Sequence, residues 1–242
     1  MSYKTKNQLD FFLDIEFENS IFEVKSKFGH SIWDVIRFDI WMKISRSNSN
    51  QITKGHQTSE NIINTFKSIK NIFFKNYKYF LLSHSRFLND KKEFYDPFYE
   101  LIQSNTDKEI FVYEKMIDKK NLANKNSVLD FIYYLKKIFL KIPFFKKIFV
   151  TKSDTNKILN FLRSSFKTTE FNEDELVELL GLFYLEKIFY KWILKYKKIE
   201  KVFFHGYSKS LLSATGELEI KSYEFQHGDI SETTFLYKYK KE

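Results

Sequence analysis

The sequence predicts an α/β fold in which a Rossmann-like, mainly parallel sheet is flanked by helices and follows a helical N-terminal part. Short apolar runs typical of buried strands occur at 79–83, 109–113, 201–206 and 221–225. Late in the chain, helical and strand patterns alternate as they do in βαβ units. Because parallel strands are joined by such crossovers, we expect a sheet of about four to six strands.

The helical N-terminal part, 1–75, contains its clearest helix at 31–44. Apolar side chains recur there at helical spacing, at Ile32, Val35, Ile36, Ile40 and Ile44. Ser31 stands in the N-cap position, and Asp34 follows three residues later in the capping-box position. The polar segment 45–59 is predicted as a loop, and 60–74 as a second helix.

Further helices are predicted in the α/β core, 76–231. Asp96-Pro97 opens a short one, because proline is favoured at the first helical position. Others are expected at 127–140, 155–166, 173–198 and 210–217. In the longest of them Asn172 and Glu175 resemble a capping pair. The residues predicted near one face of that helix are Leu176, Leu179, Leu180, Phe183, Ile188 and Trp192.

Composition narrows the classes of partner. The chain has 242 residues, and its 43% hydrophobic and 29% charged residues are ordinary for a globular protein. A net charge of +9 suits nucleic acid, an anionic membrane or a phosphorylated substrate. The lysines are scattered and no nucleic-acid-binding motif occurs, so we expect no nucleic-acid partner. The absence of cysteine excludes disulfides and fits a reducing cytoplasm.

The sequence leaves membrane association open. No signal-peptide pattern opens the chain, and no apolar stretch reaches the roughly 18 residues of a spanning helix. The nearest approach, 128–150, interleaves Phe, Leu and Ile with lysine pairs and Pro143. It could lie in a bilayer interface, or form a helix packed on its own domain before a turn. We expect a cytoplasmic protein, either free or peripheral on the inner face of the cytoplasmic membrane.

Three predicted loops each place a histidine just after an apolar run, at 83–86, 205–208 and 226–229. In parallel sheets, ligands bind beyond the carboxyl ends of the strands, where such loops meet. The candidate substrate-binding residues in and beside these loops are Ser83, His84, Arg86, His205, Tyr207, Glu224, Gln226 and Gly228. His227 is the candidate for acid/base or positioning work, because histidine titrates near neutral pH. An ordinary turn with a histidine and a glycine is the alternative for 226–228.

Two other candidates also have plain structural alternatives. Arg37 could clamp a carboxylate or phosphate of the acceptor, or it could be an exposed helix arginine paired with Asp34 or Asp39. His84 and Arg86 could hold an anionic acceptor or form a loop ion pair. The sequence has no P-loop, no GxGxxG, no Cys/His metal set and no DxD-type motif. A metal-dependent transferase of the DxD type is therefore disfavoured, and no bound cofactor is expected.

Three segments resemble bacterial capsule and lipopolysaccharide glycosyltransferases of the GT-B architecture. They are the helix 32–37, similar to that family's "iW-x-x-x-R" segment, the strand and loop 81–86 followed by 95–97, and the segment 202–231. The last is the most specific, since Glu224, Gln226, His227 and Gly228 look like the family's "E-x-Q-H-G-x-I-S". The match spans nearly the whole chain, although 115–172 agrees only in character.

The resemblance implies that 1–242 is a single Rossmann-like N-terminal domain that holds the acceptor. In that architecture a second domain binds the nucleotide-sugar, and catalysis in the cleft between them uses no bound metal. After Ser231 the sequence departs from the family and ends in a basic tail, 232–242. We therefore expect the donor-binding domain to be absent and the chain to be a truncated or split enzyme.

The resulting functional prediction is a glycosyltransferase-like protein of capsule or O-antigen synthesis that contributes the acceptor-binding half. The nucleotide-sugar would be a co-substrate, and a glycan or lipid-linked molecule the acceptor. Catalysis would require completion by a donor-binding domain, for instance on a separate protein, since one half cannot orient both substrates. The alternative is a non-catalytic, membrane-surface scaffold subunit of a polysaccharide assembly complex.

Overall fold

A computed structural model describes most of the chain, and it divides that chain into two compact units. The described residues are 3–46, 72–85, 87–115, 122–124, 127–130, 132, 135, 151–166, 171–206 and 208–225. Of these, 3–46, 151–166 and 171–184 belong to a first unit, here called the helical unit. The remaining described residues form a second unit, here called the sheet unit. Each is described separately.

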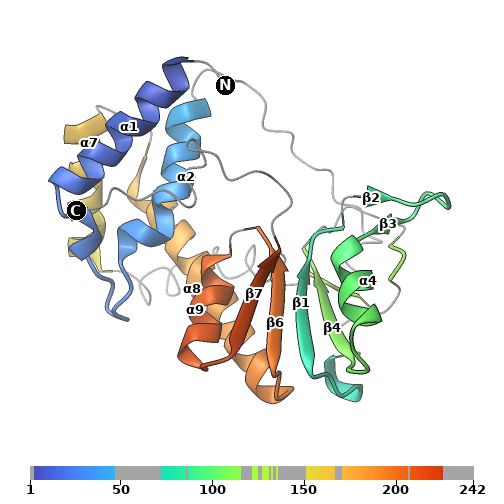
Figure 1. Cartoon of the computed structure of the whole chain (residues 1–242). Coiled ribbons are helices and arrows are strands. Elements are labelled where there is room, and N and C mark those ends of the chain that lie inside the picture. Colours follow the sequence, from blue (N-terminus) through green and yellow to red (C-terminus); the bar gives the residue numbers. More distant parts are fainter. Residues whose placement is uncertain are drawn as a thin grey trace. The chain divides into compact units, whose positions relative to one another are not determined.

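The sheet unit is built on a five-stranded parallel sheet with the order β5-β4-β1-β6-β7. The strands are β1 (Tyr79–Ser83), β4 (Ile110–Glu114), β5 (Val128–Leu129), β6 (Lys201–His205) and β7 (Lys221–Phe225). Figure 1 shows β7, β6, β1 and β4 side by side in this order. The predicted mainly parallel α/β fold is confirmed, and the arrangement is compatible with a Rossmann-like sheet.

Alternation along the strands builds an apolar layer on each face of this sheet. On one face Phe80, Phe111 and Val202 pack with apolar residues of α8 (Glu173–Tyr196) and α9 (Lys209–Glu217). On the other face Leu81, Ile110 and Val112 pack against α4 (Pro97–Ser104). Successive strand residues thus face opposite layers, and both faces of the sheet are covered.

Most predicted elements that fall among the described residues are confirmed within a few residues. Strands β1 and β7 have the predicted bounds, and β4 begins one residue later than expected. Asp96 caps α4 by accepting a hydrogen bond from the Phe98 amide at 2.9 Å. Asn172 and Glu175 form the predicted reciprocal capping box of α8, with hydrogen bonds of 3.3 and 2.9 Å.

Two predictions in this region are wrong. Val128 and Leu129 form β5 beside β4, where we expected the start of a helix; within 127–140 only 132 and 135 are described as helical. Ile188 and Trp192 do not share the buried face of α8, since they are 57% and 41% exposed. The buried stripe of α8 instead advances by alternating steps of four and three residues, through Leu176, Leu180, Phe183, Lys187, Tyr190 and Leu194.

The sequence prediction also missed some elements. A short antiparallel pair, β2 (Phe87–Leu88) and β3 (Phe94–Tyr95), follows β1. Helix α1 (Tyr3–Glu18) and a 3-10 turn, η1 (Ile21–Glu23), were not anticipated either. The predicted loop 45–59 and helix 60–74 lie almost wholly outside the described residues. The described part of the predicted helix, 72–74, is helical.

The helical unit packs α1 and α2 (Ile32–Arg46) with α7 (Lys152–Phe166) and the first half of α8 around one apolar core. The predicted cap of α2 is present, because the Ser31 hydroxyl accepts a hydrogen bond from the Asp34 amide at 3.2 Å. This unit therefore joins the N-terminal helices to segments from the middle of the chain. The prediction instead divided the chain in sequence order, into a helical N-terminal part, 1–75, and an α/β core, 76–231.

A buried ion pair lies in the core of the helical unit. Arg37 donates from Nε to Glu16 Oε1 at 2.7 Å and from Nη2 to Oε2 at 2.6 Å. The indole N–H of Trp33 donates to the same carboxylate at 2.7 Å. The two charged side chains are only 2% and 3% exposed. Because burial removes both charges from water, each depends on the other for its compensation.

Candidate functional site

The strand order of the sheet unit points to one edge of the sheet as a ligand site. From the central strand β1 the chain proceeds to β4 and β5 on one side, whereas β6 and β7 lie on the other. The direction of strand order therefore reverses between β1 and β6. In open parallel sheets ligands bind beyond the carboxyl ends of the strands at such a reversal. Here β1 ends at Ser83 and β6 ends at His205.

At this edge His205 contacts Asp96, the N-cap of α4. His205 Nε2 lies 3.2 Å from Asp96 Oδ2, and the side chains are 4% and 3% exposed. Burial raises the pKa of Asp96, but the hydrogen bond and charge of His205 and the hydrogen bond from the Phe98 amide outweigh it. The pKa of Asp96 is therefore below its usual value, so the carboxylate is ionised at neutral pH. An ionised carboxylate can only accept, which assigns the proton to His205 Nε2.

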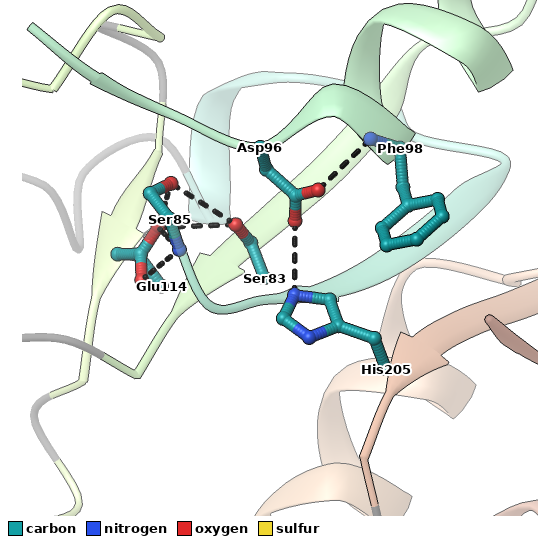
Figure 2. Close-up of polar contacts among 6 residues, drawn as sticks. All are labelled: Ser83, Ser85, Asp96, Phe98, Glu114 and His205. Atoms are coloured by element: carbon teal, nitrogen blue, oxygen red, sulfur yellow. Dashed lines mark hydrogen bonds and ion pairs between the residues drawn. The ribbon is translucent and has the colours of Figure 1, made fainter. Parts of the chain in front are cut away.

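Aromatic rings surround this pair. The ring of His84 stacks on that of His205 with centroids 5.9 Å apart and an interplanar angle of 18°. Phe98, on α4, lies 5.7 Å from His205 and stacks on Phe225 of β7 at 4.5 Å. In Figure 2 the Asp96 carboxylate lies between the Phe98 amide and the His205 ring. Through these contacts His205 fixes the ends of β1 and β6 against the start of α4.

A second polar cluster forms where β1 and β4 end. Glu114 is fully buried, and it accepts hydrogen bonds from the hydroxyls of Ser83 at 3.0 Å and Ser85 at 2.5 Å. The Ser85 amide also points at this carboxylate, at 3.1 and 3.2 Å from its two oxygens. Figure 2 shows both serines directed toward Glu114. Because three donors compensate its burial, Glu114 holds the loop after β1 in a fixed conformation.

A pocket of about 370 Å³ opens beside these two clusters. Its lining combines hydroxyl, carboxylate, amide and phenol groups with a substantial apolar surface, and consists of Ser83, Ser85, Tyr95, Asp96, Tyr99, Glu100, Val112, Ala123, Asn124 and Ser127. The pocket size suits a small ligand. A ligand with several hydroxyl groups would find both donors and acceptors here, and the two tyrosines offer ring surface to its C–H groups.

The structure brings together three of the predicted site residues, Ser83, His84 and His205. Glu224 lies on β7 opposite Phe204, and strand alternation directs it away from the face that Phe225 covers. Arg37 belongs to the helical unit, where its guanidinium forms the buried ion pair with Glu16. It is therefore buried within that unit, and neither the predicted acceptor clamp nor an exposed arginine describes it. The remaining predicted residues, Arg86, Tyr207, Gln226, His227 and Gly228, lie outside the described residues.

Sequence reasoning named neither Asp96 nor Glu114 as a site residue, and it included Ser85 only as part of the loop 83–86. Asp96 was identified as the start of a helix and as part of the resembling segment 95–97, and Glu114 lies one residue past the predicted end of its strand. An acidic residue directly after an apolar run was the available signal. His205 and Asp96 are 109 residues apart in the sequence, so their pairing depends on the strand order.

No group of three or more histidine, aspartate or glutamate side chains in the described part of the chain could hold a metal ion. None of the described helices is long and apolar enough to cross a membrane. No known protein family matches the chain, and no curated protein or solved structure does so either.

Proposed function

We propose that this chain supplies the acceptor-binding half of a nucleotide-sugar-dependent glycosyltransferase of bacterial surface-polysaccharide synthesis, and that the pocket beside β1 and β4 holds a sugar of the acceptor. The observation that carries the proposal is the lining of this pocket. Its hydroxyl, carboxylate and phenol groups match the alternating polar groups and C–H faces of a sugar ring. The position at the carboxyl edge of a parallel sheet, next to the strand-order reversal, also supports it.

The sequence adds a second line of support. The segment that resembles the capsule glycosyltransferases, Glu224 to Ser231, begins within β7 and continues past its last residue, Phe225. We assign His227 the acid/base or positioning role that the resemblance implies. His205 is a positioning residue in this proposal, because its buried ring orients Asp96 and the start of α4. Asp96, ionised and at the pocket wall, would accept a hydrogen bond from an acceptor hydroxyl.

Turnover of nucleotide-sugars tests the proposal. The full chain is incubated with radiolabelled UDP-, GDP- and CMP-sugars and an undecaprenyl-diphosphate-linked sugar, with and without the product of the neighbouring gene. We expect label to enter the lipid-linked fraction. In Asp96→Asn the cap of α4 is retained, since asparagine is also a good N-cap, but the charge is lost. We expect this variant to lower kcat/KM at least tenfold, which is an order-of-magnitude expectation for a lost charged contact.

The matched control is Asp107→Asn, which removes a carboxylate that is 88% exposed in the same unit. It should leave turnover unchanged. If neither the chain nor the mixture transfers any of these sugars while circular dichroism shows a folded protein, the catalytic proposal fails. Loss of surface polysaccharide on gene deletion would then favour the non-catalytic scaffold subunit.

A further inference from the structure

An exposed aromatic face lies on the second half of α8 and on the neighbouring residues 73–74, all within the sheet unit. Phe73 and Phe74 are 51% and 84% exposed, and Ile188, Trp192 and Tyr196 are 57%, 41% and 49% exposed. Scattered exposed apolar side chains need no explanation, but a contiguous group marks an interaction surface. Together with Lys195, these five residues are here called the aromatic–lysine face.

The contacts between the rings show that Phe73, Trp192 and Tyr196 form a contiguous group. Trp192 stacks on Tyr196 with centroids 5.6 Å apart and an interplanar angle of 10°. Phe73 lies 6.1 Å from each of these two rings. Ile188, Trp192 and Tyr196 are spaced by four residues, so helix geometry aligns them along one side of α8. The aromatic surface is therefore preformed on regular structure rather than gathered on a loop.

One buried lysine ties the two parts of this face together. Lys197 donates from Nζ to the Lys75 carbonyl at 2.8 Å, and its ammonium lies 4.8 Å from the centre of the Tyr196 ring. The end of α8 is thus held to the segment that carries Phe73 and Phe74. The cation–π contact also orients Tyr196. Both contacts keep the aromatic rings in place without a partner present.

The charged residues of the two segments that carry the face are all lysines. Residues 188–198 contain four lysines and no acidic residue, and 72–79 contain two lysines and no acidic residue. Lys195 and Lys198 are exposed at the border of the rings. Acidic residues beside these segments contact lysines: Glu186 lies 3.8 Å from Lys115, Glu217 pairs with Lys187 and Lys191, and Glu200 pairs with Lys78. A ligand for this face therefore carries negative charge.

We propose that the aromatic–lysine face docks on an anionic phospholipid surface. Trp and Tyr are the side chains that favour the headgroup level of a bilayer, because one part of each ring system is apolar and another is polar. Lysines beside them reach anionic headgroups while their stems remain among apolar groups. A second copy of the chain would bring the same positive charges together, so self-association is disfavoured. The inference uses the surface alone and does not depend on the proposed glycosyltransferase function.

Vesicle binding by the full chain tests this inference. Cosedimentation is measured with vesicles of phosphatidylcholine alone and of phosphatidylcholine mixed with phosphatidylglycerol. We expect binding to the mixed vesicles, weakened by salt, and much less to the neutral ones. Lys195→Glu with Lys198→Glu should lower the partition coefficient by about tenfold or more, whereas the control Lys221→Glu, on the exposed edge strand β7, should leave it unchanged.

A second measurement examines insertion of the rings. Brominated phospholipids should quench part of the tryptophan emission, and Trp192→Phe should abolish that quenching, because Trp33 and Trp41 are 0% and 7% exposed in the helical unit. Phe73→Ser with Trp192→Ser should abolish vesicle binding, and the control Tyr223→Ser, at an aromatic residue that is 43% exposed on β7, should not. Circular dichroism establishes that each variant is folded.

Three outcomes would overturn the proposal. The first is no binding to the anionic vesicles. The second is equal binding to neutral and anionic vesicles, which would remove the role of the lysines. The third is a dimer in light scattering that disappears in Phe73→Ser with Trp192→Ser, which would make this face an interface between copies of the chain. None of these measurements involves sugar transfer, so failure here and failure of the glycosyltransferase proposal are distinguishable.

Discussion

The buried pair of Arg37 and Glu16 gives the sharpest prediction about stability. Arg37→Ala removes both guanidinium hydrogen bonds, at 2.7 and 2.6 Å, and leaves the Glu16 carboxylate buried with the Trp33 N–H still bonded to it. Breaking a buried pair by removing one partner costs about 3–5 kcal/mol. At a urea m-value of about 2 kcal/mol/M, the unfolding midpoint should fall by about 2 M. The cost of about 3–5 kcal/mol is a large fraction of the roughly 5–15 kcal/mol that stabilises a typical domain.

Tryptophan fluorescence during urea unfolding measures this effect. The chain has three tryptophans, and in a Trp192→Phe background the emission comes from Trp33 and Trp41 of the helical unit. Arg163→Ala is the matched control, because Arg163 is exposed on α7 of the same unit. Its effect should stay within about 0.5 kcal/mol.

A double variant separates the cost of an unpaired charge from the worth of the pair. Glu16→Leu with Arg37→Met removes both charges, and well-packed apolar replacements of buried pairs are often neutral or stabilising. The Trp33 N–H then loses its acceptor, which costs about 1–3 kcal/mol. The double variant should therefore be more stable than Arg37→Ala. If Arg37→Ala costs less than about 1 kcal/mol, as at a surface arginine, the reasoning from burial is wrong.

Two further predictions concern single groups. Asn172→Ala removes the capping box of α8 and should lower the free energy of unfolding in urea by about 1 kcal/mol. The control Glu178→Ala, on the exposed side of the same helix, should have little effect. Equal effects of the two variants would contradict the capping argument. Burial, helped by the charge of Glu109, raises the pKa of Tyr77 to about 12. Because the folded state favours the neutral phenol, its stabilising contribution is complete below pH 10 and is lost as pH rises from about 10 to about 12. Tyr77→Phe should flatten the decline of stability in that window, and an unchanged decline would contradict the assignment.

The elements that sequence analysis located best are those whose signal is local. Strands such as β1 and β6 are runs of mostly buried apolar residues. The start of α4 is marked by Asp96, and the start of α8 by the pair Asn172 and Glu175. Strand β5 was missed because it has only two residues, so its pairing with β4 leaves no periodic pattern in the sequence. The signals that succeeded therefore all lie within a few residues of one another.

Burial on the two sides of a helix and contacts across the fold were harder to predict. Trp192 looks like a core residue in the sequence, but the heptad-like path of the buried stripe leaves it exposed. Arg37 has two aspartates close by in the sequence, yet its ion-pair partner is Glu16 of another helix, α1. The contact of His205 with Asp96 depends on which strands become neighbours, and no local pattern encodes that.

The pairing of β1 with β6 has a consequence for how the site forms. Tyr79 of β1 pairs with Lys201 of β6, and the chain between them contains β4, β5, α7 and α8. During synthesis, β1 and β4 can pair while β6 has not yet been made. Closing such a long loop is entropically costly, and non-local parallel pairing folds slowly. The partnership of His205 with Asp96 therefore belongs to a late step of folding, and hydrogen exchange at the end of β6 should acquire protection after the β1–β4 pair does.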